Sequence, residues 1–185
     1  MLNIKTFYCN PYRECTYVVS LPESNDCIII DPGMYGEKEE ERVRNYLKEN
    51  TLTLCAVLIT HAHPDHICGL DSLLQQYPNL PVYGKIYNLP DNNLMKICGI
   101  DIQVIPTPGH KEDCVCFYLA EHKILFTGDT LFQESVGRTD LPGGDTATLM
   151  QSLEQLCLLP DDTKVYPGHG LTTTIGYEKE NNPYL

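Results

Sequence analysis

The sequence lacks long apolar stretches and has few basic residues for its length. No apolar run approaches the roughly 18 residues that a membrane-spanning helix needs. The first twelve residues, 1–12, also lack the apolar core of a signal peptide. Lys and Arg number 13 against 25 Asp and Glu, a formal net charge of -12. Nucleic acids and anionic membranes select basic surfaces, so we expect neither as a partner.

Cysteine is present, but without the pattern of a disulfide scaffold or of a thiolate zinc site. The nine cysteines are odd in number, and no CxxC pair occurs. They make up about 5% of the chain, below the roughly 8–10% that marks disulfide-rich domains. Free cysteines in such a chain are usually small buried hydrophobic residues. We therefore expect a reducing, cytoplasmic location.

Short β-type runs alternate with helical stretches along the 185 residues, a length that suits one domain. The pattern predicts strands at 16–20, 26–31, 55–60, 81–83, 101–105, 115–120, 123–127 and 164–166. It predicts helices at 36–50, 65–77 and 146–157, followed by a short helical tail. No repeat or flexible linker interrupts the pattern. Residues 1–185 are therefore expected to form a single mixed α/β domain.

Five of the six histidines stand in three short segments, each just past a predicted strand. The first is the hexapeptide HAHPDH at 61–66, the second ends in His110 and the third contains His169. Another strand ends on the carboxylate of Asp129. Imidazole and carboxylate groups are metal ligands, and ligands at strand ends converge on the edge of a sheet. The sequence therefore predicts a metal site at this edge, whereas His122, in a polar loop, is expected to be a surface residue.

The spacing within the hexapeptide supports a metal site. His61 and His63 are two residues apart, so in an extended segment their side chains point the same way. Pro64 suits the first position of a helix, which places Asp65 and His66 in its first turn. Seven candidate ligands exceed what one tetrahedral ion with an open position takes, but they fit two adjacent metals. The expected division is His61, His63 and His110 on one metal, Asp65, His66 and His169 on the other, and Asp129 bridging.

Taken together, the motifs resemble those of the metallo-β-lactamase-fold hydrolase superfamily over most of the chain. They are His61-Ala62-His63-Pro64-Asp65-His66, Pro108-Gly109-His110, Gly128-Asp129-Thr130 and Pro167-Gly168-His169-Gly170. The resemblance implies an αββα sandwich of two mixed β-sheets flanked by helices, with the metals at one edge. Class B β-lactamases fit less well, because their second metal site usually differs at the positions of His66 and Asp129.

A more specific resemblance is to the compact bacterial glyoxalase II-like proteins, which are hydroxyacylglutathione hydrolases. It rests on residues 131–145 and on the tail 182–185. It implies hydrolysis of a small-molecule thioester such as S-lactoylglutathione, through a hydroxide that bridges two divalent ions, zinc in the first place, with iron or manganese as alternatives. Asp65 and Asp129 would be catalytic, and Arg138 would lie near the glutathione moiety. We expect no C-terminal substrate domain of the kind that larger glyoxalase II enzymes add, and the sequence gives no oligomeric state.

Two other functions stay open. The same motifs resemble the persulfide dioxygenases, which use a single iron, and a non-catalytic ligand-binding relative is the third interpretation. The chain departs from the pattern at Cys68, where relatives usually carry glycine, and at residues 111–113, where charged side chains replace small hydroxyl residues. Near the metals, Thr60, Thr107 and Asp31 are expected to hydrogen bond to the outer nitrogens of the ligand histidines.

Overall fold

Two mixed β-sheets pack face to face in the computed structural model, which describes residues 2–90 and 93–185. Sheet 1 has the strand order β1-β2-β3-β4-β5. β1, β2 and β3 are antiparallel, whereas β3, β4 and β5 run parallel. These strands span Asn3–Cys9, Glu14–Ser20, Asp26–Ile30, Thr53–Leu58 and Val82–Tyr83.

Sheet 2 has the order β13-β12-β9-β8-β7-β6, in which β9 and β12 are parallel and the other neighbours antiparallel. The strands from β6 to β9 span Leu94–Ile97, Ile100–Pro106, Val115–Leu119 and Ile124–Gly128. β12 and β13 span Lys164–Pro167 and Thr173–Thr174. A small ribbon of β10 (Leu131–Phe132) and β11 (Ser135–Val136) follows β9.

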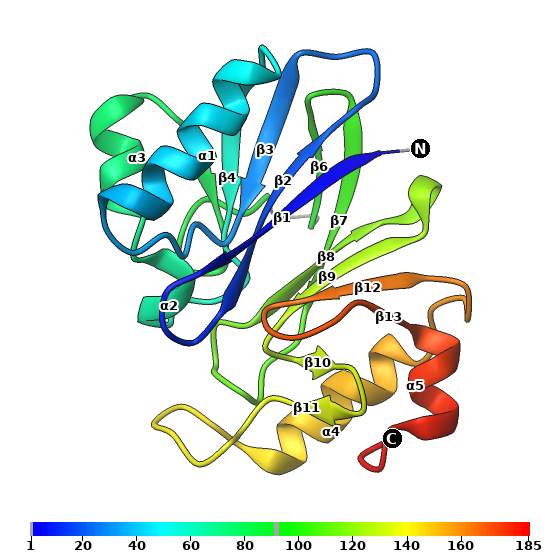
Figure 1. Cartoon of the computed structure of the whole chain (residues 1–185). Coiled ribbons are helices and arrows are strands. Elements are labelled where there is room, and N and C mark those ends of the chain that lie inside the picture. The colour runs from blue at the N-terminus through cyan, green and yellow to red at the C-terminus, as the bar shows by residue number, and fades with distance from the viewer. Residues whose placement is uncertain (1, 91–92) are drawn as a thin grey trace.

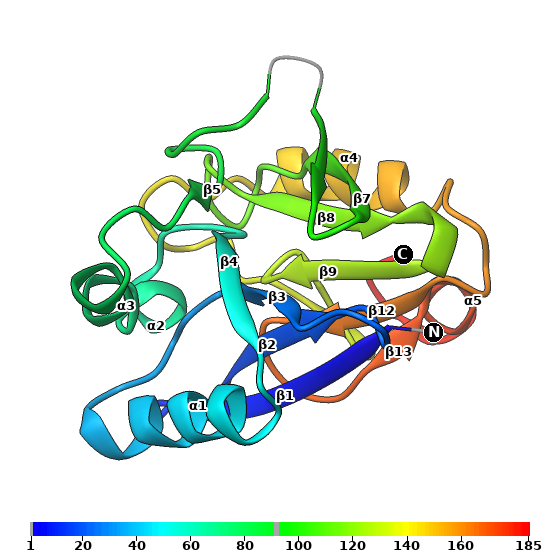
Figure 2. The ribbon, with the colours of Figure 1, turned by 90° about the horizontal axis from the view of Figure 1, so that it is seen from above.

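Helices cover the outer faces of both sheets, as Figures 1 and 2 show. α1 (Glu37–Glu49) and α3 (Leu70–Gln76) pack on sheet 1. α4 (Thr146–Leu156) and α5 (Ile175–Asn181) pack on sheet 2. The short α2 (Pro64–Ile67) follows β4, and the 3-10 turn η1 (Ala120–His122) joins β8 to β9. The layers are therefore helix, sheet, sheet and helix, which confirms the αββα sandwich.

Alternating side chains build the three apolar layers that the described residues form. Ile28 and Ile30 of β3 point between the sheets, toward Phe117 and Phe126 of sheet 2. Ile29 points the other way and packs with residues of α1 and α3. Because successive residues of a strand face opposite sides, a strand covered on both faces has to be apolar at nearly every position. This explains the continuous apolar run of β3.

The predicted helix at 65–77 is in fact two helices, α2 and α3, separated at Cys68 and Gly69. The backbone N–H of Gly69 donates to the Pro32 carbonyl at 2.8 Å instead of continuing the helix. A Cβ at Gly69 would lie 2.9 Å from that carbonyl and 2.9 Å from Cε of Met34. The chain therefore breaks where the helix is pressed against the loop after β3, a contact that periodicity does not report.

The structure also contains strands that the pattern did not predict, chiefly β1 and β6. Both lie at the edges of their sheets, and exposed residues alternate with less exposed ones along most of their length. Edge strands need less apolar sequence, because one side faces solvent. No helix in the described ranges is both long and apolar enough to cross a membrane. The cytoplasmic location stays a prediction.

Candidate metal centre

The ends of β4, β7, β9 and β12 deliver the predicted ligand segments to one edge of the sandwich. His61 and His63 follow β4, and Pro64 is the first residue of α2, as predicted. His110 stands in the loop after β7, Asp129 directly follows β9, and His169 stands two residues after β12. The side chains at these strand ends converge, as the sequence predicts, although their roles as ligands stay a prediction.

The first group consists of His61, His63 and His110, whose ring nitrogens lie within 4.8 Å of one another. His61 Nε2 is 3.0 Å from His63 Nδ1, and His110 Nε2 is 2.9 Å from that same atom. His61 and His110 are buried, while His63 is half-buried. This is the set that the sequence assigns to one metal.

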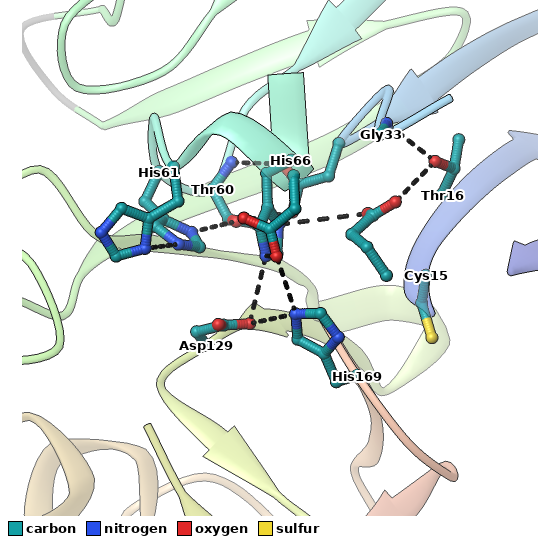
Figure 3. Close-up of polar contacts among 12 residues, drawn as sticks. Cys15, Thr16, Gly33, Thr60, His61, His66, Asp129 and His169 are labelled. Carbon is teal, nitrogen blue, oxygen red and sulfur yellow. Dashed lines mark hydrogen bonds and ion pairs between the residues drawn. The ribbon is translucent and has the colours of Figure 1, made fainter. Parts of the chain in front are cut away.

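The second group consists of Asp65, His66 and His169, whose potential ligand atoms also lie within 4.8 Å of one another. His169 Nε2 lies 3.3 Å from Asp65 Oδ2, and His66 Nε2 lies 4.0 Å from it. His66 is fully buried, whereas Asp65 and His169 are partly open to solvent. Figure 3 shows the ring ends of His66 and His169 both facing Asp129.

Asp129 stands between the two groups and faces each with one oxygen. Its Oδ1 lies 3.3 Å from His66 Nε2 and 3.7 Å from His169 Nε2. Its Oδ2 lies 3.6 Å from His110 Nε2. A carboxylate placed in this way has the geometry of a bridging ligand (Figure 3).

The outer nitrogens of His61 and His66 are fixed by one hydrogen-bond network. His66 Nδ1 donates to Asp31 Oδ2 at 2.9 Å. The Thr60 hydroxyl donates to that same oxygen at 2.6 Å, and His61 Nδ1 lies 3.2 Å from Thr60 Oγ1. Because the hydroxyl proton is already used, His61 Nδ1 acts as the donor. The Nε2 atoms of both rings therefore point to the centre, and the contacts of Thr60 and Asp31 are those expected of them.

The outer nitrogens of His110 and His169 face backbone carbonyls, which only accept. His110 Nδ1 donates to the Arg138 carbonyl at 2.6 Å, and His169 Nδ1 donates to the Tyr12 carbonyl at 3.1 Å. Their Nε2 atoms therefore point to the centre. Among the described residues, His66 Nε2 and Asp129 Oδ1 are buried without a hydrogen-bond partner. Convergent, buried acceptors of this kind fit a divalent cation.

The electrostatics of the first group favour the neutral forms of His61 and His63. Burial and the nearby rings of His66 and His110 hold the pKa of His61 well below its usual value. Burial and His110 also lower the pKa of His63. Neutral imidazole is the form that binds a metal, so these side chains need lose no proton to do so.

The second group is an array of paired opposite charges. Burial lowers the pKa of His66, but the carboxylates of Asp129 and Asp31 outweigh it and raise the pKa well above its usual value. Burial raises the pKa of Asp129 and of Asp65, yet His66 and His169 respectively outweigh it, so both pKa values are lowered. The carboxylates therefore stay ionised, and a metal ion would take over the neutralising role of the histidine proton.

Other residues singled out in the sequence have more local roles. Thr107 contacts Thr130 and Cys116 rather than a histidine of the centre. Cys68 is exposed and donates to the Gly33 carbonyl at 3.0 Å. In the charged segment 111–113, Asp113 Oδ2 accepts the backbone N–H of Ala62 at 2.9 Å, which holds the loop between the first two histidines.

Sequence reasoning missed the contribution of the β1–β2 hairpin. Asn10 donates from its amide nitrogen to the carbonyls of Gly33 and Asp65, at 3.0 and 2.8 Å. Glu14 is fully buried, and its Oε1 lies 4.0 Å from His66 Nδ1. Burial raises the pKa of Glu14 well above its usual value, which favours the neutral form of this side chain. The one available signal was a glutamate just before the predicted strand at 16–20.

The backbone of Arg138 lies beside the centre, whereas its side chain points to solvent. Its guanidinium pairs with Asp140, with both N–O distances at 2.7 Å. Arg138 and Tyr184 line a hollow of about 320 Å³. Tyr177 lines a different hollow and contacts Glu134. The predicted substrate role of Arg138 stays a prediction.

Replacing Asp31 with asparagine is expected to weaken metal binding roughly 10- to 100-fold, the usual effect of losing a residue that orients a ligand histidine. The amide removes the charge that holds the proton on His66 Nδ1. Competition with a chelator would measure the affinity. Asp162→Asn, an exposed carboxylate paired with Lys123, is the matched control, and equal affinities for both variants would contradict the role of Asp31.

A double sheet covered by helices, with imidazoles and carboxylates gathered at one edge, defines a metal-binding α/β sandwich protein. The sequence model of the Metallo-beta-lactamase superfamily matches residues 13–99 and 99–169. The chain therefore belongs to this superfamily, whose members bind divalent metals.

Known proteins and solved structures are similar to nearly the whole of this chain. The hydroxyacylglutathione hydrolase GloC of Haemophilus influenzae is 33% identical over 213 residues, covering 100% of this chain and 98% of the relative. The crystal structure of BLEG-1, described as a B3 metallo-beta-lactamase, superimposes with a TM-score of 0.91 at 32% identity, over 100% and 99% of the two chains. The crystal structure of TTHA1623 in a di-iron-bound form superimposes with a TM-score of 0.84 at 34% sequence identity, covering 98% of this chain and 100% of that chain. The chain is thus a metallohydrolase of this superfamily.

Proposed function

We propose that the chain is a binuclear metallohydrolase that cleaves a small-molecule thioester such as S-lactoylglutathione. The observation that carries the proposal is Asp129, whose two oxygens face two separate groups of candidate ligands. GloC, a hydroxyacylglutathione hydrolase similar to the whole chain, supports the substrate class. The proposal keeps residues 1–185 as a single domain, since the similarity to GloC covers nearly the full length of both chains.

In this proposal the side chains of the protein would hold two metal ions in place, and the bound ions would make the hydrolysis of the carbonyl group possible. When bound, two divalent ions, zinc or alternatively iron or manganese, provide an activated water nucleophile and a Lewis acid for the carbonyl. The assigned ligands are His61, His63 and His110 in one group, Asp65, His66 and His169 in the other, and Asp129 between them. Asp31 and Thr60 hold the rings of the buried histidines in their orientation.

Asp65 and Asp129 are the proposed catalytic carboxylates. Asp65 is partly exposed, and its pKa is lowered by the hydrogen bond with His169, which outweighs burial. It is therefore ionised at neutral pH and available to accept a hydrogen bond from the attacking water. The thiolate leaving group needs little acid help, because thiol pKa values lie near about 8.5. Arg138 is the proposed contact for an anionic part of the substrate.

The experiment is hydrolysis by the metal-loaded protein of S-lactoylglutathione, other thioesters, a lactone, a phosphodiester and a cephalosporin. We expect thioester cleavage with kcat/KM of about 10⁴ M⁻¹ s⁻¹ or more, together with two ions per chain by elemental analysis. The cephalosporin is included because BLEG-1 is described as a B3 metallo-beta-lactamase. No cleavage of any thioester would refute the proposal, and a single iron with oxygen consumption on a persulfide would replace it with dioxygenase activity.

A further inference from the structure

Two cysteines and a carboxylate meet at the end of the fold away from the candidate metal centre. The side-chain ligand atoms of Asp26, Cys55 and Cys98 all lie within 4.8 Å of one another. Asp26 begins β3, while Asp31 of the metal centre follows the last residue of that strand. Five residues of strand extend over about 16 Å, so the two places are separate. We name these three residues the thiol cluster.

The thiol cluster joins the two sheets. Asp26 and Cys55 belong to β3 and β4 of sheet 1, whereas Cys98 stands in the turn between β6 and β7 of sheet 2. Figure 1 shows this turn near the start of β3, at the opposite end from α2. The Cys98 thiol also contacts the backbone carbonyl of Cys27 in β3, at 3.9 Å. A ligand held by all three side chains would therefore cross-link the sheets.

The turn does not itself require a cysteine. Ile97 and Ile100 are paired, so the connection is the two-residue segment Cys98-Gly99, with φ values of 52° and 79°. Turns with two positive φ angles favour asparagine followed by glycine. Cysteine in this left-handed conformation is an unfavourable choice for the backbone. The turn therefore does not account for the residue, whose side chain packs against the apolar layer between the sheets and faces Cys55 and Asp26.

The chemistry of the thiol cluster fits a thiophilic divalent cation. Both thiols are partly exposed and Asp26 is exposed, so an ion can reach them from solvent. Burial, the hydrogen bond with Cys55 and the charge of Asp26 raise the pKa of the Cys98 thiol to about 12. The negative charge of Asp26, which opposes a free thiolate, attracts a cation instead. Two sulfur ligands and one carboxylate oxygen, completed by water, make a tetrahedral set that suits zinc.

We propose that Asp26, Cys55 and Cys98 form a zinc site, separate from the candidate metal centre, that ties the β6–β7 turn to the start of β3 and β4. On binding, each thiol releases its proton to solvent and coordinates as a thiolate. The site is structural: it lies away from the histidines and joins the β6–β7 turn of sheet 2 to β3 and β4 of sheet 1.

Cadmium titration of the reduced protein tests the proposal. Bonds between cadmium and thiolates absorb in the ultraviolet by charge transfer, whereas the histidines and carboxylates of the metal centre give no such band. We expect the band in the unaltered protein, and its loss in Cys55→Ser and in Cys98→Ser. Cys157→Ser, which removes another partly exposed thiol, and Cys68→Ser, beside the metal centre, are expected to keep it.

Zinc analysis gives a second readout that does not depend on absorbance. The unaltered protein is expected to hold one more zinc ion per chain than Cys98→Ser, and Asp26→Asn is expected to bind that ion less tightly. Circular dichroism would verify that the variants are folded. A band that persists in both cysteine variants, or one lost only in Cys68→Ser, would overturn the proposal. So would unchanged zinc content in folded Cys98→Ser.

Discussion

Replacing Asp129 with alanine is expected to lower thioester turnover by about 10³-fold or more and to remove at least one metal ion per chain. The carboxylate faces His66 and His169 with one oxygen and His110 with the other. Its loss takes a ligand from both groups at once and leaves the buried His66 without its anionic neighbour. Metal analysis and thioester hydrolysis on the same preparation would measure both effects.

The control for Asp129→Ala is Asp101→Ala, which removes an exposed carboxylate paired with Lys96. This variant is expected to keep its metal and its activity, because surface ion pairs contribute little. Thermal unfolding would show that both variants are folded. If folded Asp129→Ala bound two ions per chain and turned over normally, the assignment of a bridging carboxylate would be wrong.

Replacing Gly168 with alanine is expected to disturb the centre through a single methyl group. A Cβ at this position would lie 2.3 Å from Asp129 Oδ1 and 2.6 Å from His66 Cε1, closer than real contacts allow. The backbone cannot easily move away, because Gly168 donates to the Gly128 carbonyl and accepts from Cys15 N–H, both at 2.8 Å. The ligand side chains must shift instead. A displacement of about 1 Å costs roughly 10²-fold in rate.

Gly170→Ala provides the matched control for this steric argument. Gly170 has a φ of +85°, and a Cβ there would have no described atom within 4 Å. Alanine at this position strains the backbone and lowers the stability, but it leaves the centre untouched. We therefore expect near-normal metal content and turnover. Equal activity of Gly168→Ala and the unaltered protein would contradict the close approach of this backbone to Asp129 and His66.

The sequence predicted the parts of the centre that depend on local geometry. His61 and His63 follow a strand and Pro64 begins a helix, because these features are set by neighbours in the chain. The contacts of the β1–β2 hairpin could not be predicted from the sequence, because the Tyr12 carbonyl and His169 are separated by 157 residues in the chain. No local pattern records which backbone carbonyl faces a distant imidazole. The break in the helix at Gly69 escaped prediction for the same reason.

The thiol cluster is a second example of a contact between distant residues that local sequence does not predict. In the sequence, the cysteines at 55 and 98 are far apart and lack any ligand spacing, so the expectation of small buried hydrophobic residues was reasonable. Most of the others do have buried positions, such as Cys27 and Cys116. The pairing of Cys55 with Cys98 comes from the packing of one sheet on the other, which strand prediction does not provide.

The contact between the β1–β2 hairpin and the segment after β12 has a consequence for how the protein is made. The Cys15 N–H donates to the Gly168 carbonyl, and Glu14 forms an isolated bridge with His169, so the β1–β2 hairpin closes on a segment that is synthesised much later than the hairpin itself. His61 and His63 are synthesised more than a hundred residues before His169. The proposed centre is therefore incomplete until His169 has been synthesised, and a nascent chain truncated before His169 would lack one of the proposed ligands.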